Sequence, residues 1–485
     1  MTIQQISPVA HLPLVLGVVR KLNVAALIDT FCPPHPAHIL SCGRGVEALL
    51  LAILDGHHAL YKVGARLEER GMLPLLQDGL GRVSLNDYRL GQILEALFGA
   101  NLHRVFGAIA LNALDVYAIA PPWLHQDTTT LTLYGAYEEE ARLVNGLVPP
   151  RPAYGHSKDG RDDLKQVLLS LGVSSDGLPL RMGLRDGNTS DSTETPVAIE
   201  ECLALGLDGV RGIVADSKAY CKRTLGLCLE QGVGLITLVP RTCAVRQELE
   251  TWGQQQEALP LLLEKPGRTR QESPRRWHGT SVVRQVAVEY ADGRIAVEAI
   301  RFLVVPSSQL AQQAAVASTA AQAKEAERIT EHIRRVEARW FACATDAAAA
   351  IADYRGRGQG RRGRTPRLWR YHALPYRVEA VSAPAKRTRR GRPPKGEAPQ
   401  IEVRYWLSVH PEPLVPAEAA HGWTILATTV RPAVCPDAEI LQAYQEQHIT
   451  VEPGFRWIKN AAAISPVWRE KPARMAALAM LTGVG

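Results

Sequence analysis

The chain has 485 residues, of which 46% are hydrophobic. At roughly 150 residues per domain this length predicts about three domains with sizeable cores, and it excludes a protein that is disordered throughout. The net charge of +7 and the pI near 9 indicate a polyanionic partner.

Two further function classes are not expected. No stretch of about 18 consecutive apolar residues is present, so no membrane span is predicted. The chain begins without the charged region and long apolar core of a signal peptide.

The eight cysteines form no CxxC pair, and no histidine cluster joins them at zinc spacing. They are typical of reduced core thiols in a cytosolic protein.

Residues 10–115 are predicted to be helical. Gly43–Leu54 is one apolar helix, and a second helix with a single apolar stripe follows an N-cap at Ser84 or Asn86. We therefore assign residues 1–118 to a helical N-terminal domain. This domain has no clear helix-turn-helix spacing, so DNA binding and a plain packing or dimerisation role both remain open.

A strand that contains an acid opens the next segment. Pro121-Pro122 ends the helical run, and the β-formers Trp123–Tyr134 surround Asp127. A second short apolar strand ends at Asp216. An aspartate in a β-run is disfavoured, because its carboxylate competes for backbone hydrogen bonds and is costly to bury unpaired. The two acids therefore indicate a shared metal site, although each would also fit as a surface cap on a strand end.

The segment between and after these acids alternates strands and helices. The apolar runs Gln166–Val173 and Leu178–Arg185 meet at an Asp-Gly turn and predict a hairpin. The further expected elements are a helix at Pro196–Leu205, a helix at Lys222–Gln231 and a strand at Leu235–Val239. A hairpin followed by β-α units is the pattern of a mixed α/β sheet, in which ligands gather at the carboxyl ends of strands. We assign residues 119–240 to the first part of this core.

Residues 241–420 interrupt the pattern and are predicted to be a β-rich insertion. Its expected strands include Val282–Glu289, Arg294–Val305 and Ile401–Val409, and an Ala-rich helix or helix pair spans 309–354. Residues 421–485 would then complete the core. They end in an apolar helix, 474–485, that looks cut short.

The basicity of the chain is concentrated in one linker, 355–395. This linker has 14 Arg and Lys and one acid, Glu379, which gives it a local charge of +13. It contains Arg390-Gly-Arg392-Pro, the core of an AT-hook that lays arginines into a narrow A·T minor groove. We expect Arg390 and Arg392 to contact DNA. The alternative is a solvated linker whose charge aids solubility.

A third acid, Glu452, lies in a helix predicted at 437–460. Lys459 follows it by two turns on the same side, and Pro453-Gly454 predicts a kink or a break in the helix. Asp127, Asp216 and Glu452 are oxygen donors without His or Cys, which favours Mg²⁺ or Mn²⁺ over zinc. Two such ions roughly 3.5–4 Å apart activate an attacking oxygen and stabilise a leaving one at phosphorus.

Four motifs in this order resemble the DDE transposases of bacterial insertion sequences. They are His125-Gln-Asp-Thr-Thr-Thr, Gly187-Asn-Thr-Ser-Asp191, Val214-Ala-Asp-Ser-Lys and Tyr444…Glu452-Pro-Gly-Phe-Arg-Trp-Ile-Lys459. The resemblance is to the branch whose third acid lies in a Tyr-Arg-Glu-Lys motif after a β-rich insertion, and it covers most of residues 10–485. Three features depart from that motif. Gln447 stands at the Arg position, the spacing from Tyr444 to Glu452 is one residue longer, and Pro453 follows the acid.

The resemblance implies a fold and a reaction. The fold is α/β, with an RNase H-like mixed sheet and helices, preceded by an all-α N-terminal domain and interrupted by the β-rich insertion. The reaction is cut-and-paste transposition, with two Mg²⁺ (or Mn²⁺) ions at Asp127, Asp216 and Glu452. It is phosphoryl transfer without a covalent protein intermediate. Two alternatives are a two-metal nuclease that does not join DNA, and an impaired transposase that only binds DNA ends.

The implied partners are DNA, as transposon ends and target, and a second copy of the chain in the synaptic complex. No membrane is implied, and the implied location is the bacterial cytoplasm, in association with the nucleoid. Tyr444 and Lys459 match motif residues that contact DNA phosphates in the family, and Arg456 lies between them on the same helix. Lys158 and Arg161 are further candidates for DNA contact, although a polar turn explains them equally well.

Overall fold

The computed structural model describes most of the chain in two compact units. The described residues are 9–56, 59–135, 137, 142–207, 209–267, 273–356, 369, 371–384, 401–414, 422–459 and 471–485. The first unit comprises Met1–Val305 with Thr424–Gly485, and the second comprises Pro306–Trp423. The divisions expected at residues 118, 240 and 420 stay predictions.

The first unit begins with helices, as the apolar periodicity predicts. They are α1 (Leu12–Lys21), α2 (Val24–Phe31), α3 (Cys42–Leu54), α4 (Leu60–Glu69), α5 (Leu73–Leu76), the 3₁₀ turn η1 (Arg82–Leu85), α6 (Asp87–Gly99) and α7 (Leu102–Tyr117). The side chain of Asn86 accepts a hydrogen bond from the backbone N of Arg89 at 2.8 Å, so Asn86 is the N-cap of α6. An all-α region therefore precedes the sheet.

A large mixed sheet follows in the first unit. Its strands are β1 (Trp123–Leu133), β2 (Lys165–Ser174), β3 (Pro179–Asp186), β4 (Gly212–Ala215), β5 (Gly234–Leu238), β8 (Thr280–Glu289), β9 (Ile295–Pro306) and β15 (Trp423–Thr428). Their order is β3-β2-β1-β4-β5-β15-β9-β8. The pairs β3-β2 and β2-β1 are antiparallel, β1-β4 and β4-β5 are parallel, and β15 is antiparallel to β5. This is the expected RNase H-like mixed sheet.

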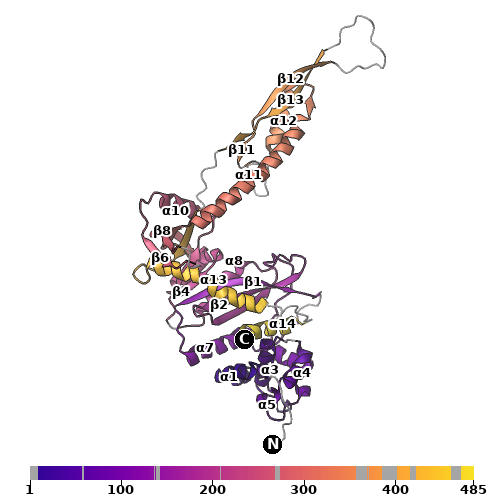
Figure 1. Cartoon of the computed structure of the whole chain (residues 1–485), viewed down its shortest axis with the longest axis vertical. Helices are drawn as coiled ribbons and strands as arrows, with labels where there is room; N and C mark the ends of the chain where they lie inside the picture. The colour runs from indigo at the N-terminus through magenta and orange to yellow at the C-terminus, as the bar shows by residue number, and fades with distance from the viewer. Residues whose placement is uncertain are drawn as a thin grey trace, which may run out of the picture. The chain divides into compact units, whose positions relative to one another are not determined.

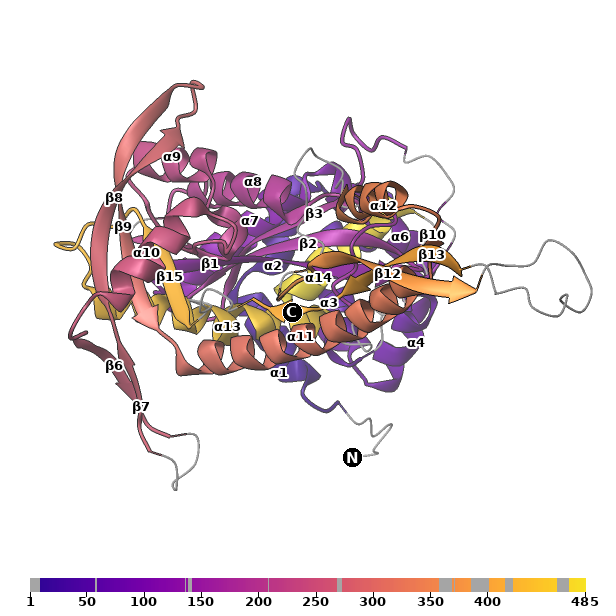
Figure 2. The ribbon, with the colours of Figure 1, turned by 90° about the horizontal axis from the view of Figure 1, so that it is seen from above.

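Helices cover both faces of this sheet. Figure 2 shows α8 (Asp191–Leu203) and α9 (Lys222–Glu230) on one side of β1 and β2, and α13 (Asp437–Lys459) on the other. The remaining elements of the unit are η2 (Ser217–Ala219), α10 (Ala244–Gln254), β6 (Leu261–Lys265), β7 (Arg275–His278) and α14 (Pro472–Val484). The sheet is therefore buried on both faces around β1, which explains why β1 and β2 are apolar at most positions.

The helix α14 joins the N-terminal helices to the sheet. It packs against α3, α6 and α7 and also against β3 (Figure 1). Nearly all of its residues from Ala473 to Thr482 are buried, so its apolar character on every side reflects burial between two layers. One hydrophobic cluster extends from Leu12 in α1 to Leu171 in β2 and Ile458 in α13. The N-terminal helices and the sheet thus share a core.

No single helix of the described residues is long and apolar enough to cross a membrane. The pair α6 and α7 matches a membrane span by length and composition alone, and the two helices are bent by 88° at the break between them.

The break expected at Pro453 is absent, because α13 is one helix from Asp437 to Lys459. Proline removes one helical hydrogen bond and clashes with the preceding turn, so another interaction has to compensate. Val451, Phe455 and Ile458 lie on both sides of Pro453 and are buried in the same hydrophobic cluster. This tertiary packing keeps the helix continuous through Pro453.

The second unit is built around a helix pair and a small sheet. Its elements are α11 (Ser308–Glu337), β10 (Trp340–Phe341), α12 (Ala344–Gly356), β11 (His372–Ala373), β12 (Tyr376–Pro384), β13 (Ile401–Val409) and β14 (Glu412–Pro413). The three-stranded sheet has the order β10-β13-β12 and is antiparallel. Val336, Phe341 and Leu407 are buried in its core. The strand β10 separates α11 from α12, so the Ala-rich stretch is a helix pair.

Candidate active site

The parallel pairing of β1 with β4 brings Asp127 beside Asp216. The register pairs Trp123 with Gly212 and Gln126 with Ala215, and each acid is the next residue on its strand. Asp216 directly follows β4 and is the N-cap of η2. The sequence predicts both acids near the carboxyl ends of neighbouring strands. The register makes them neighbours, but Asp127 lies within β1, which continues to Leu133.

Each of these two carboxylates is held by a backbone hydrogen bond. Asp127 Oδ1 accepts from the backbone N of Thr128 at 2.7 Å. Asp216 Oδ1 accepts from the backbone N of Lys218 at 2.9 Å. Both residues are half-buried. In each carboxylate, one oxygen accepts from a backbone N one or two residues further along the chain. The neighbouring backbone therefore sets the orientation of each carboxylate.

Burial disfavours the charged forms of the two acids. The pKa of Asp127 is raised to about 6, mainly by burial and also by the charges of Asp216 and Asp191, against the lowering effects of the Thr128 hydrogen bond and Lys158. Burial is also the main cause of the raised pKa of Asp216. Carboxylates whose charged form is disfavoured in this way are stabilised by a nearby cation.

Lys158 provides part of that positive charge from inside the site. Its Nζ donates to Thr128 O at 2.7 Å and to Thr128 Oγ1 at 2.8 Å, and it lies 3.2 Å from Asp191 Oδ2. The Thr128 hydroxyl donates to Asp191 Oδ1 at 2.9 Å. Lys158 is therefore held against the residue that follows Asp127. Sequence reasoning did not select Asp191 as a site residue, although the motif that ends in Asp191 was part of the resemblance.

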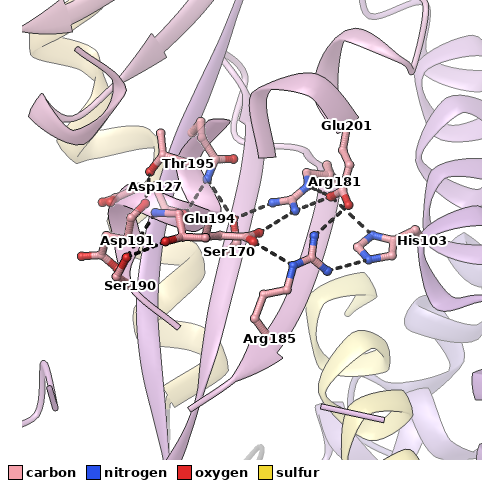
Figure 3. A network of polar contacts seen from close by, with 12 residues as sticks. His103, Asp127, Ser170, Arg181, Arg185, Ser190, Asp191, Glu194, Thr195 and Glu201 are labelled. Carbon is pink, nitrogen blue, oxygen red and sulfur yellow. Dashed lines mark hydrogen bonds and ion pairs between the residues drawn. The ribbon is translucent and has the colours of Figure 1, made fainter. Parts of the chain in front are cut away.

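A buried ion network supports β1 from the α8 side (Figure 3). Arg181 of β3 binds Glu194 at 2.9 Å and also pairs with Glu201, both on α8. Arg181 also donates to Ser170 Oγ, which accepts a second hydrogen bond from Gln126 Nε2 at 2.9 Å. The side chains of Arg181 and Glu194 are 3% and 2% exposed. The network therefore links α8 to the strand position that precedes Asp127.

The same network reaches an N-terminal helix. Arg185 binds Glu194 and Glu201 at 2.7 Å each, and its Nη1 lies 3.3 Å from His103 Nε2 on α7. Figure 3 shows these residues in a row from Asp191, at the start of α8, to His103. The polar network thus connects the acid-bearing part of the sheet with the N-terminal helices.

Tyr444 and Gln447 bring α13 to the two acids. Burial raises the pKa of Tyr444 to about 12, and the charges of Asp216 and Asp127 add to this shift. Gln447, at the motif's Arg position, is buried, and its Nε2 donates to Gln126 O at 3.3 Å. Tyr444 therefore lies at the acid pair, and Gln447 lies against the backbone next to it.

Glu452 is exposed on α13 beyond Gln447. Five residues of helix separate the two, an axial rise of roughly 7.5 Å. Glu452 is not among the groups with the largest effects on the pKa of Asp127 or Asp216. Within the described part of the chain, no three His, Cys, Asp or Glu side chains are grouped so that they would hold a metal ion. The structure thus brings Asp127 and Asp216 together, and it does not group Glu452 with them as a third ligand.

The predicted DNA-contacting residues lie in different surroundings. Lys459 forms an ion pair with Asp159 at 2.6 Å, and Arg161 forms one with Asp163 at 2.8 Å. Arg456 is exposed on α13. Arg390 and Arg392 lie outside the described residues.

Two family descriptions match this chain. Residues 127–482 match the transposase DDE domain, and residues 4–111 match a domain of unknown function (DUF4277). The chain belongs to the DDE transposase family. It is thus an enzyme that acts on DNA, and its family generally uses divalent metal ions. A comparison with curated proteins finds no match to this transposase.

The donor set of the transposase suits a hard divalent cation. Asp127 and Asp216 present carboxylate oxygens, which Mg²⁺ and Mn²⁺ prefer. Each carboxylate has one oxygen in a backbone hydrogen bond, and burial raises the pKa of both groups. A divalent ion would stabilise their ionised forms.

Proposed function

We propose that this transposase cleaves the ends of an insertion sequence and transfers them to target DNA, using Asp127, Asp216 and Glu452 to hold two Mg²⁺ or Mn²⁺ ions. The observation that carries the proposal is the adjacency of Asp127 and Asp216 on parallel strands, with raised pKa values. Bound divalent ions supply Lewis acidity and charge neutralisation at the reacting phosphorus.

The residues around the acids prepare the site for an anionic substrate. The backbone amides of Thr128 and Lys218 orient the two carboxylates before any ion arrives. The ammonium group of Lys158 offsets part of the negative charge and so reduces the repulsion that a phosphodiester meets on approach. Tyr444 presents a phenol with a raised pKa, which therefore stays protonated as a hydrogen-bond donor to a phosphate oxygen.

The third acid is Glu452 in this proposal, although Asp191 is electrostatically closer to the pair. Both oxygens of Asp191 are already engaged, one by the Thr128 hydroxyl and one by Lys158. Asp191 therefore anchors Lys158 and has less capacity to bind a metal ion. Glu452 lies on the helix that already contacts Gln126 through Gln447. We propose that Glu452 completes the site when DNA and metal ions are bound.

DNA contacts are proposed for the basic residues around this site. Arg456 and Lys459 of α13, with Lys158 and Arg161, would meet the phosphates near the cleaved end. Lys459, Lys158 and Arg161 each have a carboxylate partner, so phosphates would compete with Asp159, Asp191 and Asp163 for them. Arg390 and Arg392 of the basic linker would contact the minor groove further away.

The principal test replaces Asp216 by Asn. Asparagine keeps an oxygen that accepts from the backbone N of Lys218 but removes the charge, so folding and DNA binding should persist. Cleavage of a labelled element end with Mg²⁺ should fall by at least about 10³-fold. Asp186→Asn is the matched control, because Asp186 also ends a strand of this sheet and accepts from a backbone N, that of Arg151 at 2.8 Å. Full cleavage by the Asp216→Asn variant would refute the proposed site.

A second pair of variants tests the third acid. Glu452→Gln should abolish cleavage, whereas Glu446→Gln, which changes another acid of α13, should leave it within a few-fold of the wild type. Asp191→Asn should weaken cleavage less than Glu452→Gln does, because its effect acts through Lys158. If Asp191→Asn abolishes cleavage while Glu452→Gln does not, Asp191 is the third acid instead.

Joining activity distinguishes a transposase from a nuclease that only cuts. Pre-cleaved element ends with a free 3′-hydroxyl, incubated with target DNA and Mg²⁺, should give joined products. These products should require Asp127 and Asp216, because one set of acids serves both steps in this proposal. Cleavage without joining would support the nuclease, and end binding without cleavage would support an impaired transposase.

A further inference from the structure

Two cysteines meet at the corner between α2 and α3. Cys32 is the residue that ends α2, and Cys42 is the first residue of α3. Cys32 and Cys42 line the same cavity, and each is the neighbour with the largest effect on the pKa of the other. Both thiols are reduced, and the two residues are 7% and 8% exposed. The pair is separated by ten positions in the sequence, so the spacing itself does not reveal it.

The backbone holds this corner together. Asp29, one turn before Cys32, accepts a hydrogen bond from the backbone N of Gly43 at 2.7 Å. A Cβ atom added to Gly43 would lie 2.1 Å from the carbonyl oxygen of Ala25, so α2 and α3 are in backbone contact there. Cys42 directly precedes Gly43. The meeting of the two sulfur atoms therefore follows from the close approach of two helices.

The environment of Cys42 favours its thiolate. The hydrogen bond from Cys32 is the main cause of its lowered pKa, and the positive charge of Arg89 lowers it further against the effect of burial. Arg89 is held in place because its Nη2 donates to Leu40 O at 2.7 Å. A thiol at the first turn of a helix gains from the helix dipole as well. The place of Cys42 at the start of α3, in the same cavity as Arg89, therefore favours Cys42 over Cys32 as the nucleophile of the pair.

A cavity gives small molecules access to both sulfur atoms. Its volume is about 460 Å³, and its lining includes Cys32, Cys42, Pro33, His35, His38 and Arg89. This volume lies within the range of small-molecule sites in proteins. Glu95 also lines the cavity and binds Arg474 of α14 at 2.8 Å. The pair is therefore buried in the helix corner yet open to a small reactant.

We propose that Cys32 and Cys42 form a reversible disulfide by exchange with a small disulfide that enters this cavity. The Cys42 thiolate attacks one sulfur atom of the small disulfide, which releases one small thiolate and leaves a mixed disulfide on Cys42. Cys32 then loses its proton and attacks the Cys42 sulfur, which releases the second small thiolate. The protein loses two hydrogen atoms and the small disulfide becomes two thiols. The new bond ties the end of α2 to the start of α3.

The test uses the full chain and oxidised glutathione. After incubation, free thiols are alkylated under denaturing conditions and the protein is digested with trypsin. Residues 22–44 form one tryptic peptide that contains both cysteines, since Lys21 precedes it and Arg44 ends it. This peptide should carry no alkyl group and be lighter by two hydrogen atoms than the unalkylated reduced peptide. The alkylated thiols should number two fewer than the eight of the reduced chain.

Two variants make the result specific. In Cys32→Ser the exchange should stop at the first step, so peptide 22–44 should carry one glutathionyl group on Cys42. In Cys435→Ser, which changes another buried thiol, the disulfide should form as in the wild type.

The proposal is overturned if both cysteines of peptide 22–44 remain alkylatable in the oxidised wild type. It is also overturned if the Cys32→Ser variant shows no glutathionyl group on Cys42. DNA cleavage does not enter this readout, so it is independent of the proposed function.

Discussion

At the residue scale, the site depends on how burial and charge act on single carboxylates. Asp127 is half-buried and lies near Asp216 and Asp191, and the pKa near 6 shows that burial outweighs its backbone hydrogen bond and the influence of Lys158. In a chain without metal ions, the ionised form of this group is therefore a cost to stability. Metal-binding carboxylates commonly behave in this way, because their ionised form destabilises the metal-free protein and a bound cation stabilises it.

Asp127→Asn should stabilise the metal-free protein at neutral pH. The folded-state pKa lies above the unfolded value of 3.8, so wild-type stability falls as pH rises from about 4 to about 6 and then stays level. Asparagine removes this loss while keeping an oxygen for the Thr128 hydrogen bond. The expected gain is about 2 to 3 kcal/mol above pH 6 and about zero near pH 4. Urea denaturation in EDTA at both pH values measures it.

The same measurement with Mg²⁺ provides the control. Magnesium should raise the unfolding midpoint of the wild type more than that of the Asp127→Asn variant, because the variant has lost a ligand. An equal midpoint for the two proteins in EDTA at pH 7.5 would contradict the charge repulsion described for Asp127.

At the element scale, buried ionic contacts decide how α8 and β3 meet behind the strand that carries Asp127. The guanidinium of Arg181 is 3% exposed and is shared between Glu194 and Glu201 of α8 and Ser170 of β2. Removing one partner of a buried pair costs more than the pair contributes, because the other charge stays buried without compensation. Arg181 therefore acts as the link between two elements.

Arg181→Met should destabilise the protein by about 3 kcal/mol, the low end for a broken buried pair, since Glu194 and Glu201 would keep Arg185 as a partner. Arg151→Met is the matched control, because Arg151 is 66% exposed and its ion pair with Asp186 spans 3.7 Å. That control should change stability by less than about 0.5 kcal/mol. Chemical denaturation of both variants gives the comparison. A loss for Arg181→Met no greater than that of the control would rule out the linking role.

At the scale of the whole molecule, charge is divided unequally along the chain. The net charge is +7, but residues 355–395 alone carry 14 Arg and Lys and one acid, so the remainder is net acidic. An acidic body repels DNA, and a basic linker attracts it over a distance set by the ionic strength. We therefore expect this linker to supply much of the affinity that does not depend on DNA sequence.

Replacement of the 14 Arg and Lys residues of 355–395 by Gln should flatten the salt dependence of DNA binding. Substitution is preferred to deletion because the segment contains the strands β11 and β12. Each phosphate contact contributes about −0.9 to the slope of log K against log salt. The loss of several contacts should therefore make this negative slope shallower by several units. Fluorescence anisotropy with a labelled duplex between low and moderate salt measures the slope. The Gln variant retains the length of the segment. An unchanged slope would exclude DNA contact by its Arg and Lys residues.

Local patterns in the sequence determine a large part of this protein. Helical spacing and caps predict α3 and α6, β-formers predict β1, and two apolar runs joined by an Asp-Gly turn predict β2 and β3. The ordered motifs around Asp127, Asp216 and Glu452 indicate the family. These features depend on residues close together in the chain. Of the kink or break predicted at Pro453, the break does not occur, because residues distant in sequence pack against α13 and keep it continuous.

Long-range contacts decide the remaining features. The sequence by itself identifies the two aspartates, but the parallel register of β1 and β4 makes them neighbours. The sequence selects Lys158 as a candidate for DNA contact, whereas the fold binds it to Asp191 and Thr128. It shows eight scattered cysteines, whereas the packing of α2 on α3 brings two of them to one cavity. Motif and periodicity depend on chain neighbours, whereas pairing, charge balance and burial depend on which distant segments the core brings together.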